Sequence, residues 1–376
     1  MEEIEKVREL FPITKNAVFL NHAASSPLPG PVAEAMRKCI DNVSNFGPYH
    51  EDLTELGKDW FAKLVNADVG EVALVENTSV GMNIAANVLR APHGSKVVTT
   101  DLEYPTVVYP FLRRSLGYRV HYVKNVDGKV RIEDVEKAVD DETVAVAISQ
   151  VEYANGFRFD LKPISEIAHE HGAYLIVDAI QACGAIPVDV KRDNVDFLAT
   201  ACYKWLLSSP GAGFLYVKKE LVERFEPPMV GWASVNQEIF NTTEFWDIWQ
   251  MPYSDTASRF EVGSSGVISF IGAREAIKLL LNTGIENIEK RVLKLTDYLI
   301  DRLTASGIKL QTPLEPQHRS GIVNFKVAHP KETADKLAKK GIIISPRANG
   351  IRVSPHFYNT EEEIDKLVEE VKKSEG

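Results

Sequence analysis

The chain has 376 residues, of which 44% are hydrophobic and 26% are charged, and its formal net charge is −10. A chain of this length predicts two domains with ample material for a hydrophobic core. The acidic balance offers no footprint for nucleic acid or for an anionic membrane surface, so we expect neither as a partner. A ligand that carries phosphate would need a local positive site in this acidic protein.

The cysteine content and the N-terminus point to a reduced, cytoplasmic setting. Cys39, Cys183 and Cys202 are few, odd in number and without paired spacing, which predicts neither a disulfide framework nor a metal site. The N-terminal residues are charged and contain no apolar stretch typical of a signal peptide. The apolar runs are far shorter than the ~20 residues that cross a membrane.

Strands and helices alternate along the first part of the chain. Periodicity predicts helices at Glu2–Phe11, Pro31–Val43, Asp52–Leu64, Val107–Leu116, Ile132–Val139 and Ile164–His171, and a further helix that is capped by Asn77 or Thr78 and runs through Met82 to Leu89. Short apolar runs predict strands at Ala17–Leu20, Val72–Val75, Lys96–Thr99, Arg119–Val123, Thr143–Ser149, Tyr174–Val177, Phe197–Thr200 and Phe214–Val217. All-apolar strands separated by helices favour a mainly parallel α/β sheet covered on both faces.

The pattern changes after residue 282. A long helix is predicted at Ile285–Ser306, and shorter elements follow: strands Gly321–Val327, Ile342–Ser345 and Ile351–Ser354, and helices Glu332–Lys340 and Glu361–Lys373. We therefore expect a small α+β domain over residues 283–376 and a large domain over residues 15–282. Residues 1–14 are expected to pack with the small domain.

Asp178 and Lys204 follow two of the predicted strands. Ligands of open α/β sheets bind at the carboxyl ends of strands. A buried carboxylate there needs a cation such as a protonated pyridine nitrogen, and a poorly solvated lysine favours the neutral amine that forms an imine. Taken singly, Asp178 is better explained as a turn cap and Lys204 as a surface lysine. Their placement at the ends of successive strands changes that balance.

Thr78 and Ser79 stand where a helix begins after a strand, with Asn77 or Thr78 as its cap. The free N–H groups, the hydroxyls and the helix dipole can hold a phosphate, although a plain helix cap fits the same residues. Neither G-x-G-x-x-G nor G-x-x-x-x-G-K-[ST] occurs here, so an NAD-linked oxidoreductase and a P-loop enzyme are both disfavoured.

Three further side chains could contact a ligand of this kind. Gln181 could hydrogen-bond a phenolic oxygen, and Tyr104 could stack on a pyridine ring. Arg352 is a lone cation in an apolar strand and could hold a carboxylate in two places, with Arg347 as a weaker candidate. Packed or solvent-exposed roles remain open for all of these residues at this point.

Taken together, these segments resemble the class V aminotransferase family of fold-type I enzymes that depend on pyridoxal 5'-phosphate (PLP). The strongest block runs from Val177 to Val190 and continues through DFLATACYKWL at residues 196–206 and PGAGFLYV at residues 210–217. The resemblance extends from FLNHAA at residues 19–24 to RVSPHFYNT at residues 352–360, nearly the whole chain. It implies a seven-stranded, mainly parallel sheet in the large domain and a homodimer with its active sites at the subunit interface.

The resemblance also assigns roles. It places the Schiff-base lysine on Lys204, the ring-nitrogen aspartate on Asp178 and the phenolic-oxygen glutamine on Gln181. The phosphate turn falls on Thr78 and Ser79, a stacking position on Tyr104 and the α-carboxylate arginine on Arg352. The segment RFEVGSS at residues 259–265 implies that Ser264 and Ser265 approach the cofactor of a neighbouring subunit, and His22 lies in a loop that approaches the active site.

The sequence departs from desulfurases of this family at several positions. Tyr203 replaces a histidine, Ala201 replaces a phosphate-binding serine for which Thr200 could substitute, and Tyr153 replaces an asparagine for which Asn155 could stand in. Arg347 and Arg352 are separated only by Ala-Asn-Gly-Ile, without the cysteine that forms a persulfide in desulfurases. Cys202, near Lys204, fits a buried core residue better.

We therefore expect a PLP enzyme that acts on the α-carbon of an amino acid, first of all an aminotransferase. A C–S lyase acting by β-elimination on cysteine-type or cystine-type substrates and an amino-acid epimerase are the alternatives, since the same residues serve all three reactions. A non-catalytic scaffold with the same fold is disfavoured by the intact Asp178, Gln181 and Lys204.

Overall fold

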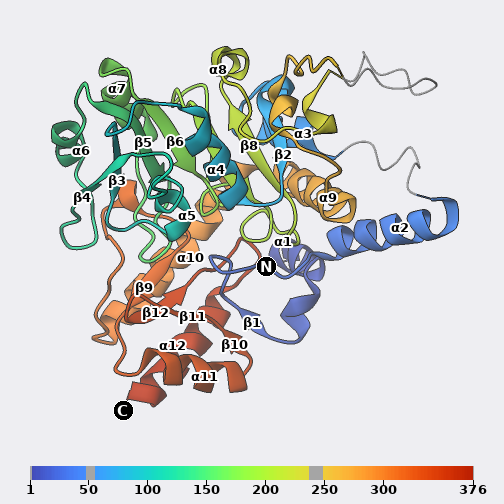
Figure 1. Cartoon of the computed structure of the whole chain (residues 1–376). Coiled ribbons are helices and arrows are strands. Elements are labelled where there is room, and N and C mark those ends of the chain that lie inside the picture. Colours follow the sequence, from blue (N-terminus) through green and yellow to red (C-terminus); the bar gives the residue numbers. More distant parts are fainter. Residues whose placement is uncertain (1, 48–55, 237–248, 376) are drawn as a thin grey trace.

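A seven-stranded sheet forms the centre of the larger part of the chain, with the strand order β2-β8-β7-β6-β5-β3-β4 (Figure 1). This computed structural model describes residues 2–47, 56–236 and 249–375. The strands of the sheet are β2 (Val72–Val75), β3 (Lys96–Thr100), β4 (Arg119–Val123), β5 (Thr143–Ser149), β6 (Tyr174–Asp178), β7 (Phe197–Ala201) and β8 (Gly213–Val217). Only β8 runs antiparallel to its neighbours. The expected mainly parallel seven-stranded sheet is therefore confirmed.

The strands are apolar on both faces because helices cover both. Alternate side chains of a strand point to opposite faces. Leu175 and Val177 thus join one hydrophobic core, whereas Ile176 between them joins the other. The first core contains residues of α3 (Lys58–Val65), α6 (Ile132–Ala138), α7 (Leu161–Glu170) and α9 (Val267–Thr283), and the second contains residues of α4 (Thr78–Val88), α5 (Pro105–Val108) and α8 (Lys219–Arg224).

The C-terminal part forms a smaller unit with a core of its own. Strands β9 (Val323–Phe325), β11 (Ser345–Arg347) and β12 (Gly350–Val353) make an antiparallel sheet in the order β11-β12-β9. Three helices pack with it: α10 (Ile285–Ala305), α11 (Pro330–Lys339) and α12 (Glu361–Glu375). Gly284, at the predicted boundary, ends α9 and precedes α10.

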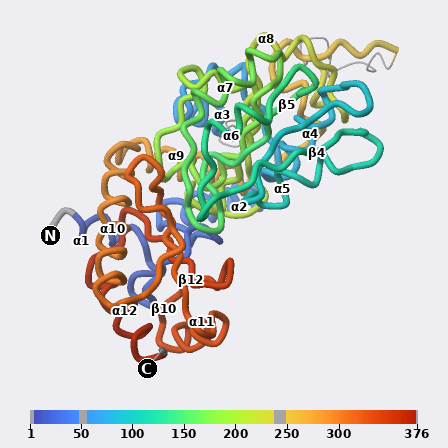
Figure 2. The backbone as a smooth tube through the Cα atoms, turned by 90° about the vertical axis from the view of Figure 1, so that its left-hand side faces the viewer, coloured from blue at the N-terminus to red at the C-terminus, as the bar shows by residue number. Residues whose placement is uncertain are grey.

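The N-terminal segment lies against this smaller unit, as Figure 2 shows for the blue and red parts of the chain. Strand β1 (Val18–Phe19) pairs with β10 (Ile342–Ile343). Helix α1 (Glu2–Glu9) carries Arg8 in its last turn, and the Arg8 guanidinium forms an ion pair with Glu363 at 2.8 Å. These contacts agree with the expectation that the first residues pack with the small domain, while the domain boundaries themselves stay predictions.

Several predicted helix bounds differ from the structure. Helix α5 covers only four residues instead of Val107–Leu116, because Pro110 has no N–H and cannot continue a helix. Helix α3 begins at Lys58, and the predicted start at Asp52 lies outside the described residues. Helix α2 (Gly30–Phe46) is longer than predicted. Within the described ranges, no helix is both long and apolar enough to span a membrane.

Gly184 allows the chain after β6 to approach the backbone next to Lys204. Its φ is +94°, and a Cβ placed there would lie 2.3 Å from the Trp205 carbonyl oxygen. Gly172 also has a positive φ, +69°, but a Cβ there would meet nothing within 4 Å. Alanine substitutions at the two glycines therefore distinguish the cost of backbone strain from the cost of steric overlap.

We predict that Gly184→Ala lowers the melting temperature by several degrees more than Gly172→Ala. Both variants carry the cost of a left-handed alanine, about 1–2 kcal/mol, but only Gly184→Ala must also move the Trp205 backbone. Differential scanning calorimetry of both variants measures the difference. Equal losses would show that the close approach at Trp205 does not constrain the fold.

Candidate active site

A cavity of about 530 Å³ opens at the edge of the sheet where the parallel strands end. Its lining comes from the segments that follow β2, β3, β6 and β7 and from the segment that precedes the antiparallel β8. The lining residues are Glu76, Asn77, Thr78, Ser79, Tyr104, Thr106, Asp178, Ile180, Tyr203, Lys204, Pro210 and Gly211. The structure thus brings together six of the candidate residues, Thr78, Ser79, Tyr104, Asp178, Tyr203 and Lys204.

Asp178 and Lys204 form the charged centre of this cavity. Parallel pairing of β6 with β7 sets Asp178 beside Ala199, and Lys204 follows the end of β7. The Asp178 side chain accepts one backbone hydrogen bond from Ile180 at 2.9 Å and is buried. Burial raises the Asp178 pKa to about 6, although the nearby Lys204 lowers it. Burial lowers the Lys204 pKa to about 8, while Asp178 opposes that shift.

The N-terminus of α4 forms one wall. Asn77 caps the helix by accepting a hydrogen bond from Val80 N at 3.1 Å, which leaves Thr78 and Ser79 in its first turn. The buried Thr78 hydroxyl has no hydrogen-bond partner in the part of the chain that the structure describes, and the Ser79 hydroxyl lies 3.0 Å from that of Thr106. Hydroxyls and free N–H groups at a helix N-terminus are well suited to an anion.

Tyrosines surround the lysine. The Lys204 ammonium lies 5.9 Å from the Tyr104 ring centroid and 5.8 Å from that of Tyr203. Tyr104 packs edge-on against Tyr153, with ring centroids 5.0 Å apart. A planar ligand bound at Lys204 would therefore meet aromatic side chains.

Arg352 approaches the same region from the smaller unit. It is buried in β12 and donates from Nη1 to the Tyr153 carbonyl at 2.7 Å, while its Nε has no partner among the described residues. Burial lowers the Arg352 pKa to about 10, and the neighbouring Arg347 lowers it further. A buried guanidinium with an unused N–H is well suited to a carboxylate.

Comparison with known proteins identifies the family of this chain. The model of the family described as "Aminotransferase class-V" matches residues 18–367. The chain belongs to that family. It is 34% identical over 373 residues to the "Uncharacterized aminotransferase YcbU" of Bacillus subtilis, covering 98% of this chain and 97% of that protein. It is 31% identical to the "Probable cysteine desulfurase" of Methanothermobacter thermautotrophicus, covering 99% and 98%.

Solved structures agree in fold. The cysteine desulfurase of Thermococcus onnurineus superposes with a TM-score of 0.89 at 26% identity, covering 99% of this chain and 98% of that one. The cystine C–S lyase C-DES superposes with a TM-score of 0.87 at 22% identity, covering 96% and 98%. The expected fold type I architecture is thus confirmed, and this class V aminotransferase is a PLP-dependent enzyme acting on an amino acid.

The residues present fit PLP. Lys204, with its lowered pKa, supplies an amine for the cofactor aldehyde, and the buried Asp178 carboxylate supplies the partner for a ring N–H. The unpartnered Thr78 hydroxyl at the start of α4 supplies a donor for phosphate oxygens. An amine, a carboxylate and an anion site in one cavity match the three polar ends of this cofactor.

The structure does not bring three other predicted residues into the cavity. Gln181 accepts from Trp205 Nε1 at 2.8 Å and donates to Ala23 O at 3.0 Å. His22 is fully buried, with its ring nitrogens 3.1 Å from Ser354 O and 3.1 Å from the Tyr358 hydroxyl. Asn155 donates to Gly128 O at 2.6 Å and accepts from Phe157 N at 3.1 Å. All three therefore make structural contacts between distant segments.

Thr200, Ser264 and Ser265 also lie outside the lining. Thr200 alternates with Ala199, which faces α4 across Gly81, so the Thr200 side chain lies on the opposite face of the sheet from the α4 N-terminus. A phosphate role for Thr200 thus finds no support in this placement. Ser264 is exposed and Ser265 partly exposed, so their expected role toward a neighbouring subunit stays a prediction.

Sequence reasoning missed two neighbouring carboxyls near the cavity, the buried Glu152 and the half-buried Glu103. Glu103 follows β3 and accepts hydrogen bonds from Ser149 N and Oγ, both at 2.7 Å. Glu152 follows the neighbouring β5 and accepts from Thr100 at 3.1 Å, while its second oxygen has no donor in the described part of the chain and faces Glu103. Their position after strands is the same signal that indicated Asp178.

Both carboxyls hold a proton more tightly than a solvated glutamate does. Burial raises the pKa of Glu103 to about 8 and that of Glu152 well above its ordinary range, and the neighbouring Glu103 raises the pKa of Glu152 further. Since Glu103 accepts two hydrogen bonds from Ser149, Glu152 is the better holder of the proton. The pair ties together the two loops that carry Tyr104 and Tyr153.

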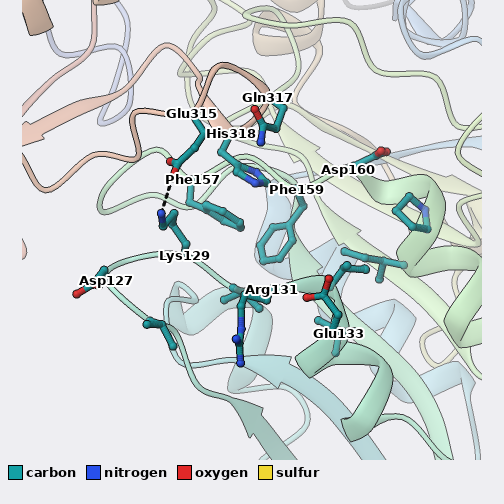
Figure 3. A pocket seen from close by; sticks show the side chains of 16 residues that line it. Asp127, Lys129, Arg131, Glu133, Phe157, Phe159, Asp160, Glu315, Gln317 and His318 are labelled. Atoms are coloured by element: carbon teal, nitrogen blue, oxygen red, sulfur yellow. Dashed lines mark hydrogen bonds and ion pairs between the residues drawn. The ribbon is translucent and has the colours of Figure 1, made fainter.

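A larger cavity of about 700 Å³ lies elsewhere, between the segment 126–135 and residues 315–318 (Figure 3). Its floor contains Phe157, which stacks on His318 with centroids 4.7 Å apart. Its cations are already paired, Lys129 with Glu315 and Arg131 with Asp134. The smaller cavity, with a perturbed lysine and a hydroxyl that has no partner among the described residues, is therefore the better candidate for the active site.

We predict that Glu152→Gln stabilises the protein at alkaline pH. Folded Glu152 holds a proton that the unfolded chain releases near pH 4.5, so wild-type stability falls as the pH rises above 4.5 toward the raised pKa of Glu152. An amide replaces that proton permanently. Melting temperatures at about pH 5 and about pH 8.5 should show the variant gaining on the wild type with rising pH. Glu166→Gln, at an exposed position of α7, should track the wild type. A pH-independent difference for Glu152→Gln would contradict the raised pKa of Glu152.

Proposed function

We propose that this class V enzyme is an aminotransferase. The observation that carries the proposal is the Asp178–Lys204 pair at the strand ends, with the Lys204 pKa lowered to about 8 inside a cavity that also holds an anion site. Arg352, with its free Nε, supplies a carboxylate site next to it. The relative YcbU, 34% identical over nearly its whole length, bears an aminotransferase name.

The chain's own residues supply binding and proton transfer. When bound, PLP supplies an electron sink for the charge that develops at the substrate α-carbon. Arg352 orients the amino acid through its carboxylate, and the buried surroundings of the guanidinium strengthen that contact. Lys204 Nζ, neutral in a substantial fraction near its lowered pKa, accepts the α-proton and returns it. The Asp178 carboxylate stays ionised beside a cation.

A persulfide relay of the desulfurase kind is disfavoured. In this chain a two-residue turn of Ala348 and Asn349 joins β11 to β12, and it contains no cysteine. Cys39, Cys183 and Cys202 are all buried, and none lines the active-site cavity. Burial raises the pKa of the Cys183 thiol to about 12, which suppresses the reactive thiolate.

A C–S lyase remains the second candidate. The relative from Methanothermobacter is named for cysteine desulfurisation, and β-elimination uses the same α-proton removal by lysine without a protein persulfide. Epimerisation would return the proton to the α-carbon from the other face. The same residues serve all of these reactions, so only their products distinguish them.

We predict that PLP gives the wild-type protein an absorption band near the visible edge and that Lys204→Ala abolishes it. Lys204→Ala should also lower turnover by roughly 10³-fold, whereas Lys219→Ala, at an exposed lysine after β8, should change neither. A colourless wild-type protein after PLP incubation would sink the proposal.

Products then distinguish the two reactions. Build-up of the pyridoxamine form with keto acid supports transamination. Pyruvate with sulfide from cysteine or cystine, without the pyridoxamine form, would replace it by the lyase.

We further propose that the enzyme works in the cytoplasm as a homodimer that shares its active sites. Ser264 and Ser265 lie outside their own chain's cavity, and the exposed side chains Val262 and Ile268 flank them in the sequence. Exposed apolar side chains beside polar groups are typical of a protein interface. The reduced, buried cysteines agree with a cytoplasmic setting.

Mixing two inactive variants tests the sharing. A hybrid of Lys204→Ala with Ser264→Asp/Ser265→Asp has one intact site, so random exchange of subunits should restore roughly a quarter of wild-type activity. Each variant mixed only with itself is the control. Absence of recovery, with subunit exchange shown by mass spectrometry, would contradict a shared site.

A further inference from the structure

Two arginines lie on one face of the β11–β12 hairpin, residues 345–353. Its register pairs Ser345 with Arg352 and Arg347 with Gly350. Directly opposite residues share a face, and so do residues two apart on one strand. Arg347 and Arg352 therefore project from the same side of the hairpin. The turn residues Ala348 and Asn349 both have positive φ, +48° and +56°, as a tight two-residue hairpin requires.

That face meets the loop behind the active-site cavity. Arg352 binds the Tyr153 carbonyl at 2.7 Å. Asn324 of β9 links the same loop to the hairpin, since its side-chain amide donates to Ala154 O at 2.8 Å and to Arg347 O at 3.1 Å. Both arginines also lie near enough to Lys204 to lower its pKa. The hairpin thus holds two cations beside the reacting lysine.

Neither cation has a carboxylate partner in the described part of the chain. Arg347 donates to the carbonyl of its neighbour Pro346 at 2.9 Å, and Arg352 donates to the Tyr153 carbonyl. Asp178 instead faces Lys204, and burial raises the pKa values of Glu103 and Glu152, which favours their neutral forms. Lys204 in the cavity and the two nearby arginines give this acidic protein three neighbouring cations, which favour a ligand with more than one negative group.

We propose that the substrate is an amino acid with a second carboxylate on its side chain. Arg352 binds the α-carboxylate, and Arg347 binds the side-chain carboxylate at the mouth of the cavity. The inference rests on the proposed function, because it assigns a substrate class to the same site. Arg347 is then a specificity-determining residue: it is exposed at the hairpin tip, where a second carboxylate can reach it from solvent.

The test compares glutarate with pentanoate, which differ only in the second carboxylate. Isothermal titration calorimetry on the PLP-loaded protein should show glutarate binding at least roughly tenfold more tightly, as a charge-assisted hydrogen bond provides. Arg347→Gln should reduce that preference to less than roughly threefold by weakening glutarate alone. Arg347→Lys should restore part of it, and Arg352→Gln should weaken both ligands.

Lys366→Gln is the matched control, because it removes one positive charge from an exposed position of α12 in the same unit. It should leave the preference unchanged. Equal affinities for the two ligands in the wild type, or an unchanged preference in Arg347→Gln, would overturn the inference. A retained PLP absorption band in Arg347→Gln shows that its fold and the proposed function stand, so failure of the one is distinguishable from failure of the other.

Discussion

The burial of the Asp178 carboxylate at the end of β6 is the constraint on which the active site depends. A carboxylate removed from water is costly unless a cation or several donors compensate. Asp178 has one backbone donor, Ile180 N, and its pKa is raised to about 6, so the fold leaves its charge incompletely compensated. Lys204 supplies part of the remainder. A protein tolerates an incompletely compensated buried charge where a cationic group of a ligand compensates the rest.

Sheet topology enforces this arrangement. Strands β2, β3, β5, β6 and β7 run in the same direction, so the segments that follow them gather at one edge. The antiparallel β8 begins at that same edge and brings Pro210 and Gly211 to the cavity. The absence of a side chain at Gly81 lets α4 approach β7 closely, since a Cβ there would lie 2.7 Å from that of Ala199. Topology and one glycine thus aim the α4 N-terminus at the lysine.

The sequence predicted those parts that depend on local patterns. The buried run Thr143–Ser149 and the break at Gly284 appear where periodicity indicated, and the strand-end residues Asp178 and Lys204 meet as expected. Contacts between residues far apart in the chain could not be predicted from local patterns. His22 forms hydrogen bonds with Ser354 and Tyr358, more than 300 residues away, and the sequence around His22 does not indicate these partners. The error in the predicted helix Val107–Leu116 could have been avoided from the sequence. Pro110 lacks the N–H that a helix needs, and this outweighs the apolar periodicity.

The Glu103–Glu152 pair shows a second limit. Each glutamate follows a strand, but their contact depends on β3 lying next to β5 although β4 comes between them in the chain. Strand order is set by packing of the whole sheet, and periodicity does not reveal it. The Glu103 carboxyl can raise the pKa of Glu152 only when those strands are neighbours.

The β11–β12 hairpin shows how one fold supports different chemistry. The superposition with the Thermococcus desulfurase covers nearly all of both chains, so the sheet, the lysine strand and the helices are common ground. The two-residue turn of Ala348 and Asn349 leaves no room for an extended loop that could carry a reactive thiol to the substrate. It instead fixes Arg347 on the face of Arg352. Because the length of this hairpin sets which side chain its tip presents, the two-residue turn is what places Arg347 near Lys204.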